Sequence, residues 1–337
     1  MSRYSRQELF APIGREGQER LRGSRVLVIG CGALGSALAE TMVRAGVGRL
    51  TVVDRDLVES SNLQRQSLFA EDDAARARPK AVAAEARLRS INSGVEVQGI
   101  VADVDPPTAA RLVGDADLVL DGTDNFETRY IVNDVCLQAG VPWVYGACVA
   151  AHGAALAIRP GTTPCLRCVL GERPAAGSGE TCDTVGVVAP IVQVVAGVQA
   201  AEALKLLTGN EAALLPGLLT ADVWTGAFDV MDLRERAPWC PSCTERRYDY
   251  ATAAGPVSSV LCGREAVQLR AEPGAVLDLR ALAARLRAAG EVMENEHLVR
   301  LRAPEAELVV FADGRAIVRG VADAARARSV YARYVGV

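Results

Sequence analysis

The sequence predicts an α/β fold with a doubly wound, mostly parallel sheet, followed by a small α+β domain. An apolar run at residues 25–30 ends in a glycine-rich turn. Short apolar segments then alternate with helical ones through the first half of the chain. Two C-x-x-C pairs follow this alternation, and each pair can place two thiolates on one tetrahedral metal ion.

The elements of the first domain follow from this alternation. Residues 25–30 form the first strand, residues 33–45 a helix and residues 50–54 the second strand. Parallel neighbours require a right-handed crossover, which the helix provides. Further strands are predicted at 95–101, 117–121 and 143–146, with helices at 76–91, 107–113 and 125–139. The pattern is that of a Rossmann-like sheet.

Three later strands, a loop and a long helix complete the first domain. The helix is expected over residues 187–207, whose apolar composition predicts burial, and the Gly/Pro/Ser-rich residues 174–179 predict a loop. The strands are predicted at residues 154–158, 218–222 and 227–232.

A second domain is expected after a short linker. We predict a first domain over residues 1–250, a linker over 251–256 and an α+β domain over 257–337. Its strands are expected at 258–262, 266–270, 298–302 and 308–311, and its helices at 277–289 and 322–334.

Composition narrows the function. The chain has 337 residues, half of them hydrophobic, so it can build a large core. Its formal net charge of −4 argues against a broad nucleic-acid surface, which is usually basic. We expect no membrane span, because no run of roughly 18 apolar residues occurs. The amino terminus resembles no signal peptide, so a cytoplasmic location is expected.

The turn after the first strand predicts a nucleotide site. Gly30, Gly32 and Gly35 fit G-x-G-x-x-G between a strand and a helix, where glycines permit close approach to phosphates. Asp54 ends the second strand, the usual place of a carboxylate that binds a ribose hydroxyl. Together these residues favour an adenosine nucleotide.

Charged residues at the same sheet edge favour a triphosphate. Such a polyanion needs more cations than helix-end amides supply, and Arg65 and Lys80 follow the second strand. Asp124 follows the fourth strand, at the edge where open α/β sheets bind ligands, and could hold Mg²⁺. A hydride-transferring enzyme would not need this set.

The nine cysteines divide into ligands, core residues and one candidate nucleophile. The pairs Cys165/Cys168 and Cys240/Cys243 can complete a tetrahedral Zn²⁺ site, whose closed coordination makes it structural. Disulfides or redox-active cysteine pairs are the alternative. Cys182 follows the predicted loop and precedes the long helix, where amide dipoles could activate its thiol. The other four are expected in the core: Cys31, Cys136, Cys148 and Cys262.

These motifs resemble those of the ThiF/MoeB/HesA adenylyltransferases, bacterial relatives of ubiquitin-activating enzymes. The resemblance covers roughly residues 1–250 and includes Arg3-Tyr-Ser-Arg6-Gln7, Asp-x-Asp-x-Val-Glu-x-Ser-Asn-Leu-x-Arg-Gln, Pro79-Lys80, Thr-Asp-Asn and the cysteine pairs. It implies Mg²⁺ on Asp124, a homodimer in which Arg6 reaches the neighbouring site, and a loop cysteine at Cys182. ATP would be bound by Gly30, Gly32, Gly35, Asp54, Asn62, Arg65, Gln66 and Lys80.

The resemblance also implies the reaction. The enzyme would join AMP to the C-terminal Gly-Gly carboxylate of a ubiquitin-like sulfur-carrier protein, releasing pyrophosphate, with a sulfur donor such as a cysteine desulfurase downstream. Thiamin, molybdopterin and thiolated-tRNA synthesis remain open as pathways, as does a covalent role for Cys182. Alternatives are adenylation of a small-molecule or tRNA-borne carboxylate and a non-enzymatic nucleotide-sensing scaffold. The second domain would dock the carrier or another partner, or be purely structural.

Overall fold

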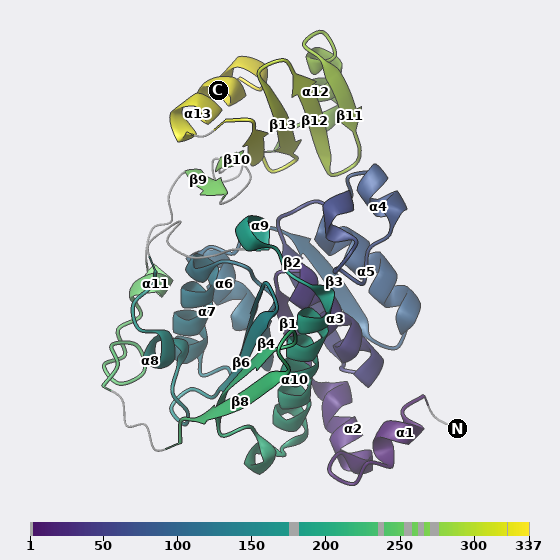
Figure 1. Cartoon of the computed structure of the whole chain (residues 1–337). Helices are drawn as coiled ribbons and strands as arrows, with labels where there is room; N and C mark the ends of the chain where they lie inside the picture. The colour runs from purple at the N-terminus through teal and green to yellow at the C-terminus, as the bar shows by residue number, and fades with distance from the viewer. Residues whose placement is uncertain are drawn as a thin grey trace. The chain divides into compact units, whose positions relative to one another are not determined.

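The computed structural model describes residues 3–174, 182–234, 239–252, 258–261, 266–269, 276–321 and 323–336. The chain divides into two compact units, Met1–Ala253 and Ala254–Val337. Figure 1 shows the elements of each unit in chain order. Each unit has a sheet and a hydrophobic core of its own.

An eight-stranded mixed sheet forms the centre of the first unit, in the order β3-β2-β1-β4-β5-β6-β7-β8. The pairings from β3 to β5 are parallel and those from β5 to β8 are antiparallel, so the parallel half carries the Rossmann-like topology. The strands are β1 (Arg25–Ile29), β2 (Arg49–Asp54), β3 (Glu96–Val101), β4 (Leu118–Asp121), β5 (Trp143–Val149), β6 (His152–Ile158), β7 (Gly217–Asp222) and β8 (Ala227–Asp232).

Helices cover both faces of this sheet. One core contains buried side chains of α3 (Ala33–Ala45), α5 (Lys80–Ile91) and α10 (Ala189–Thr208). The other core contains those of α6 (Pro106–Val113) and α7 (Phe126–Ala139). The other helices of this unit are α1 (Ser5–Glu8), α2 (Gly14–Gly23), α4 (Glu71–Ala75), α8 (Leu166–Leu170), α9 (Cys182–Val185), α11 (Asp249–Thr252) and the 3₁₀ turns η1 (Ser60–Asn62) and η2 (Glu211–Ala213).

One predicted helix begins later than expected. The helix predicted over residues 76–91 starts at Lys80, because Pro79 is extended and occupies the N-cap. Ala77 has a left-handed backbone with φ of 45°, which a continuing helix would not allow. Lys80 therefore stands at the first position of α5, and this places its side chain at the candidate site.

α10 is the one helix in the described chain that is long and apolar enough to cross a membrane. Half of its apolar window is buried, and Ile191, Val192 and Val195 belong to the same core as α3 and the sheet. Its composition is therefore explained by its place in the interior, as predicted for this segment.

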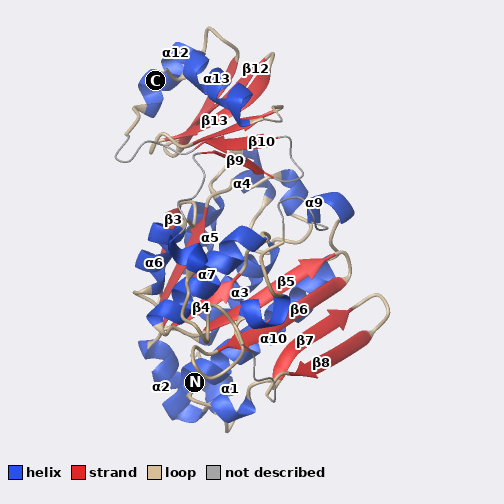
Figure 2. Cartoon of the chain, turned by 90° about the vertical axis from the view of Figure 1, so that its left-hand side faces the viewer, coloured by secondary structure: helices blue, strands red, loops and turns tan. Residues whose placement is uncertain are grey.

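The second unit is a six-stranded antiparallel sheet with two helices on one face. The strand order is β11-β12-β13-β14-β10-β9, and Figure 2 shows strands and helices of this unit from a second side. The sequence did not predict β11 and β14, which are only four residues long. The elements are β9 (Ser258–Leu261), β10 (Ala266–Leu269), α12 (Leu279–Leu286), β11 (Glu291–Glu294), β12 (Leu298–Ala303), β13 (Ala306–Phe311), β14 (Ala316–Arg319) and α13 (Ala324–Tyr334).

Candidate active site and metal centre

The glycine turn between β1 and α3 is packed against the end of β4 on one side and open on the other. A Cβ on Gly30, whose φ is +83°, would lie 2.8 Å from the Gly122 carbonyl oxygen, and one on Gly35 would lie 1.8 Å from the Gly30 carbonyl oxygen. A Cβ on Gly32 would meet nothing closer than 3.9 Å. Within the described part of the chain no side chain caps the first turn of α3, so its amides are available to an anion.

A buried lysine and two aspartates lie beside this turn. The Asp54 carboxylate accepts the Cys31 N–H on Oδ2 at 2.6 Å and the Asp56 N–H on Oδ1 at 2.7 Å. The Lys80 Nζ lies 3.2 Å from Asp56 Oδ2 and is buried. Burial raises the pKa of Asp54, and the charge of Lys80 opposes that rise. The turn is thus held by a carboxylate and backed by a buried ammonium group.

The segment after β2 adds two buried amides and an arginine. The Asn62 side chain is buried and its Oδ1 accepts the Glu59 N–H, which fixes η1. Gln66 is also buried, and its Oε1 has no hydrogen-bond partner among the residues that the structure describes. The Gln66 Nε2 is one of the two atoms nearest to the open side of Gly32. Arg65 is partly exposed and bonds only the Ser61 carbonyl in the described chain.

A buried ion pair supports the end of β4. The Arg129 Nε lies 3.2 Å from Asp121 Oδ2, and both side chains are buried. The Arg129 Nη2 also donates to the carbonyls of Thr123 and Gly146 at 2.7 and 3.1 Å. From α10, the Gln199 Nε2 donates to the Asp121 carbonyl at 2.9 Å. The turn that carries Asp124 therefore has its backbone held from two helices.

Asp124 itself is exposed at this edge, with Arg55 and Arg129 near enough for their charges to interact with it. Arg55 pairs with Asp103 at 3.1 Å. Sequence reasoning missed Arg55, Asp103 and the Asp121–Arg129 pair. Arg55 and Asp121 directly adjoin the predicted motifs, and this adjacency could have identified them as site residues. Gln199 lies in an apolar helix, where the sequence gives no indication of a role at the site.

The structure does not bring Arg6 to this site within one chain. Arg6 is exposed on α1, and the neighbouring Tyr4 ring packs against Gly46 at the C-terminal end of α3. The glycine turn lies at the other end of α3, a helix of 13 residues that spans about 20 Å. Figure 1 likewise places α1 and α2 together at that far end of α3.

Cys182 is the first residue of α9, and its side chain lies outside the described part of the structure. Residues 175–181, which include most of the predicted loop, also lie outside it. Just after α9, the Gly186 carbonyl accepts the Ala150 N–H at 2.8 Å and the Val188 N–H donates to the Ala150 carbonyl at 3.0 Å. Ala150 is in the turn between β5 and β6, at the same sheet edge as Asp121.

The four cysteines predicted as ligands meet at one point. Their Sγ atoms all lie within 4.8 Å of one another. The separations are 3.7 Å for Cys165–Cys168, 3.7 Å for Cys165–Cys240 and 3.2 Å for Cys168–Cys243. These exceed the roughly 2 Å of a disulfide bond and suit a tetrahedral metal, since Zn–S bonds of about 2.3 Å place sulfurs about 3.8 Å apart. The four cysteines form a candidate metal centre.

The thiols of this cluster respond to one another. Hydrogen bonding from Cys168 lowers the pKa of Cys165 to about 6, and the same pairing raises the pKa of Cys168. Burial raises the pKa of Cys240 to about 11. One thiolate therefore forms readily, but four such close thiolates would repel one another, so a metal cation is needed to keep all four ionised.

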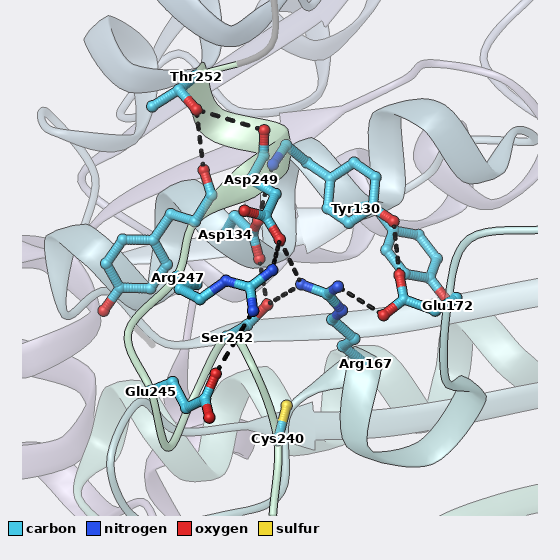
Figure 3. Close-up of polar contacts among 12 residues, drawn as sticks. Tyr130, Asp134, Arg167, Glu172, Cys240, Ser242, Glu245, Arg247, Asp249 and Thr252 are labelled. Carbon is cyan, nitrogen blue, oxygen red and sulfur yellow. Dashed lines mark hydrogen bonds and ion pairs between the residues drawn. The ribbon is translucent and has the colours of Figure 1, made fainter.

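Polar contacts around the cluster tie its two halves together (Figure 3). Arg167, between the first two cysteines, donates to Glu172 Oε1 at 2.6 Å and to Asp249 Oδ2 at 3.2 Å. The Asp134 carboxylate, on α7, accepts the Ser242 hydroxyl at 2.8 Å and the Tyr250 N–H at 3.0 Å. The segments before residue 169 and after residue 239 are thus held together by hydrogen bonds and ion pairs, in addition to the close approach of the four cysteine sulfurs.

Of the cysteines predicted for the core, Cys31 and Cys136 are buried, and burial raises both pKa values. Cys148 is half-buried, so the prediction of a core position holds only in part for it. Cys262 lies outside the described residues.

The fold is that of an α/β protein with a glycine turn after its first strand, and four cysteines are placed so that they could bind a metal ion. The ThiF family model matches residues 4–242, and the chain belongs to that family. It is 48% identical, over 99% of both chains, to the protein named sulfur carrier protein ThiS adenylyltransferase of Bacillus subtilis (strain 168). It is 41% identical to the SAMP-activating enzyme E1 of Haloferax volcanii, over 74% of this chain and 91% of that one.

Among solved structures, E. coli MccB has the same fold. It aligns with a TM-score of 0.63 and 24% identity, covering 72% of this chain and 74% of MccB. The region that aligns is about the size of the first unit.

Proposed function

We propose that this protein is an ATP-dependent adenylyltransferase that activates the C-terminal carboxylate of a ThiS-type sulfur carrier. The observation that carries the proposal is the cradle made by the open Gly32, the uncapped first turn of α3 and the buried Lys80. The Gln66 Oε1 beside it has no partner in the described residues and supplies an acceptor for a ligand donor. Family membership, and similarity to a ThiS adenylyltransferase along the whole length, support this substrate over the alternatives.

In this proposal the chain's residues position ATP and neutralise its charge. The α3 amides and Lys80 bind phosphate oxygens, and Asp54 receives a ribose hydroxyl. Asn62, Arg65 and Gln66 close the other side. Attack by the carrier's carboxylate on the α-phosphorus then needs alignment and charge stabilisation more than a general base. The products are the carrier acyl-adenylate and pyrophosphate.

Charge balance supports Mg²⁺ and a second chain at this site. The proposed site contains fewer cations than carboxylates, and three of the cations already pair with a carboxylate. The four cations are Arg55, Arg65, Lys80 and Arg129, and the five carboxylates are those of Asp54, Asp56, Asp103, Asp121 and Asp124. A triphosphate added to this set would be poorly neutralised. We infer that Asp124 holds Mg²⁺, which would supply Lewis-acid stabilisation of the phosphates.

We also infer that Arg6 of a second copy completes the site in a homodimer. Arg6 cannot reach the nucleotide turn of its own chain, because α3 separates the two. Leu9 and Phe10, which follow Arg6 directly, are exposed apolar side chains suited to a contact between copies. The Asn210 Nδ2 bonds the Pro12 carbonyl, so this turn is held beside the end of α10.

The four-cysteine cluster is proposed to bind Zn²⁺ as a structural ion. Four sulfur ligands leave no open position for chemistry. A sulfur donor, such as a cysteine desulfurase, would act after adenylation, with or without a covalent step at Cys182, and the reaction is placed in the cytoplasm. The second unit would dock the carrier or another partner, or stabilise the chain.

ATP–pyrophosphate exchange tests this function. Purified protein should exchange label between pyrophosphate and ATP only with Mg²⁺ and a carrier that ends in a free Gly-Gly carboxylate. Carrier truncated by its last glycine is the matched control. Absence of exchange with every Gly-Gly carrier of the host would overturn the proposal.

A further inference from the structure

A pocket of about 340 Å³ lies on the α6 side of the parallel sheet, near the start of β1 and β2. Its floor contains Leu27, Thr51 and Gln98, which are register partners on β1, β2 and β3. Leu112 on α6 and Ala116 in the turn after it belong to the wall, and both are buried. The volume and the mixture of apolar and hydrogen-bonding side chains are those of a small-molecule site.

This pocket is at the opposite end of the strands from the glycine turn. Arg25 and Arg49, the first residues of β1 and β2, are register partners and line the pocket. Gly30 lies about 16 Å from Arg25 along the chain, at about 3.3 Å per residue of strand. Open α/β sheets bind their nucleotides beyond the carboxyl ends of the strands. The pocket is therefore separate from the candidate nucleotide site.

Three arginines line this pocket, with one carboxylate among them. The Asp115 carboxylate lies between two guanidinium groups: Arg25 Nη1 donates to its Oδ1 at 3.1 Å, and Arg49 Nη1 donates to its Oδ2 at 3.0 Å. Arg111, in the last turn of α6, is exposed, and its side chain has no hydrogen bond or ion pair among the described residues. The ion pairs of Asp115 are exposed and contribute little to stability, so a ligand anion can replace them at little cost.

Neighbouring groups hold two of the arginines in place. Asp117, which does not line the pocket, accepts Arg25 Nη2 on its Oδ1 at 2.8 Å. The Arg49 Nη2 donates to Gln98 Oε1 at 3.0 Å. The Arg49 Nε is buried without a hydrogen-bond partner in the described chain, and the Glu96 carboxylate lies 3.6 Å away. Guanidinium groups held in this way lose little freedom when an anion binds to them.

We propose that this pocket binds a small phosphate monoester whose other end is apolar. Arginine binds phosphate oxygens through pairs of N–H groups, and three arginines line this one pocket. Three cations and one carboxylate give the lining an excess of two positive charges, which suits the −1.5 to −2 charge of a phosphate monoester at about pH 7 better than one carboxylate. The Thr51 hydroxyl has no partner in the described residues and can donate to the ligand. The apolar end packs against Leu27 and Leu112. This site does not depend on the proposed adenylation.

Isothermal titration calorimetry of the full chain with phenyl phosphate tests this site without any ATP chemistry. Phenyl phosphate should bind saturably and at least about tenfold more tightly than inorganic phosphate, because only the ester places apolar surface in the pocket. Benzoate has the same ring with a single negative charge and should bind more weakly than phenyl phosphate. Absence of saturable binding of phenyl phosphate would overturn the proposal, and so would benzoate that binds as tightly.

Two matched variants locate the bound phosphate. Arg111→Gln should weaken the binding of phenyl phosphate by about tenfold or more, because it removes a charge-assisted hydrogen bond. Arg87→Gln removes another exposed helix arginine, on α5 and outside the pocket, and should leave the binding unchanged. Both side chains are exposed, so the two variants should have the wild-type Tm. Equal binding by the two variants would refute the site. Binding that ATP abolishes and that Arg111→Gln does not weaken would place phenyl phosphate in the nucleotide site and would also refute it.

Discussion

Arg129→Met should destabilise the first unit strongly. The substitution keeps much of the aliphatic volume but removes the guanidinium that faces Asp121 at 3.2 Å in a buried setting. It also removes the donor to the carbonyls of Thr123 and Gly146. Breaking a buried ion pair from one side costs about 3–5 kcal/mol, because the remaining charge stays buried. That is a large part of the roughly 5–15 kcal/mol that stabilises a typical domain.

The loss should depend on pH in a definite direction. Burial raises the pKa of Asp121, and the charge of Arg129 opposes the rise, so the variant's Asp121 pKa should be higher still. A carboxyl group whose pKa is raised in the folded state lowers the free energy of unfolding fully at pH values above that folded pKa. This loss of stability disappears as the pH falls to the pKa of the unfolded chain, about 4. The stability gap between variant and wild type should therefore narrow on acidification.

Urea unfolding at a series of pH values measures both effects, with Arg25→Met as the matched control. Arg25 pairs with Asp117 at 2.8 Å, but both side chains are exposed, so its removal should change stability little. An Arg129→Met protein no less stable than the Arg25→Met control would refute the reasoning. So would a gap that widens as the pH falls.

Three further outcomes follow from the site. Metal analysis should find close to one zinc per chain, and Cys165→Ser should lower the Tm more than the specific activity of protein that stays folded; a metal-free protein of wild-type stability would contradict this. Verified heterodimers of Arg6→Ala and Asp124→Ala chains should regain exchange that neither variant shows alone, whereas self-contained sites would give no recovery. Cys182→Ala should retain ATP–pyrophosphate exchange. If the cysteine acts covalently, the variant should lose any reductant-sensitive adduct between enzyme and carrier. Normal sulfur delivery by the variant would show that the Cys182 thiol is not required for sulfur transfer.

The sequence predicted the parallel half of the first sheet largely because β1, β2 and β4 are short apolar runs that end at a glycine or an aspartate. β1 and β4 fit this pattern over their whole length, and the candidate site lies at their C-terminal ends. The exposed edge strand β8 was also predicted, but its place in the sheet was not, since nothing local to residues 227–232 states which strand pairs with them. Four residues carry little periodicity: β9 and β10 were predicted at that length, whereas β11 and β14 were missed.

The site was predictable where residues are adjacent in sequence and unpredictable where packing brings them together. Gly30 to Gly35 and Asp54 stand in one crossover unit, so their meeting follows from the motif. The contact of Gln199 with the Asp121 carbonyl joins residues 78 positions apart and depends on how α10 packs. Arg129 is one of many helix arginines in sequence, and only its burial against Asp121 distinguishes it.

Mass spectrometry of the carrier after incubation with the enzyme, ATP and Mg²⁺ tests the central claim most directly. The account predicts a carrier whose mass increases by one AMP, located at its terminal glycine, and reversal of that increase on addition of pyrophosphate. Carrier that lacks the last glycine should stay unmodified. A Gly-Gly carrier that remains unmodified while the enzyme is folded and binds ATP would contradict the account, as would AMP found on any group other than the terminal carboxylate.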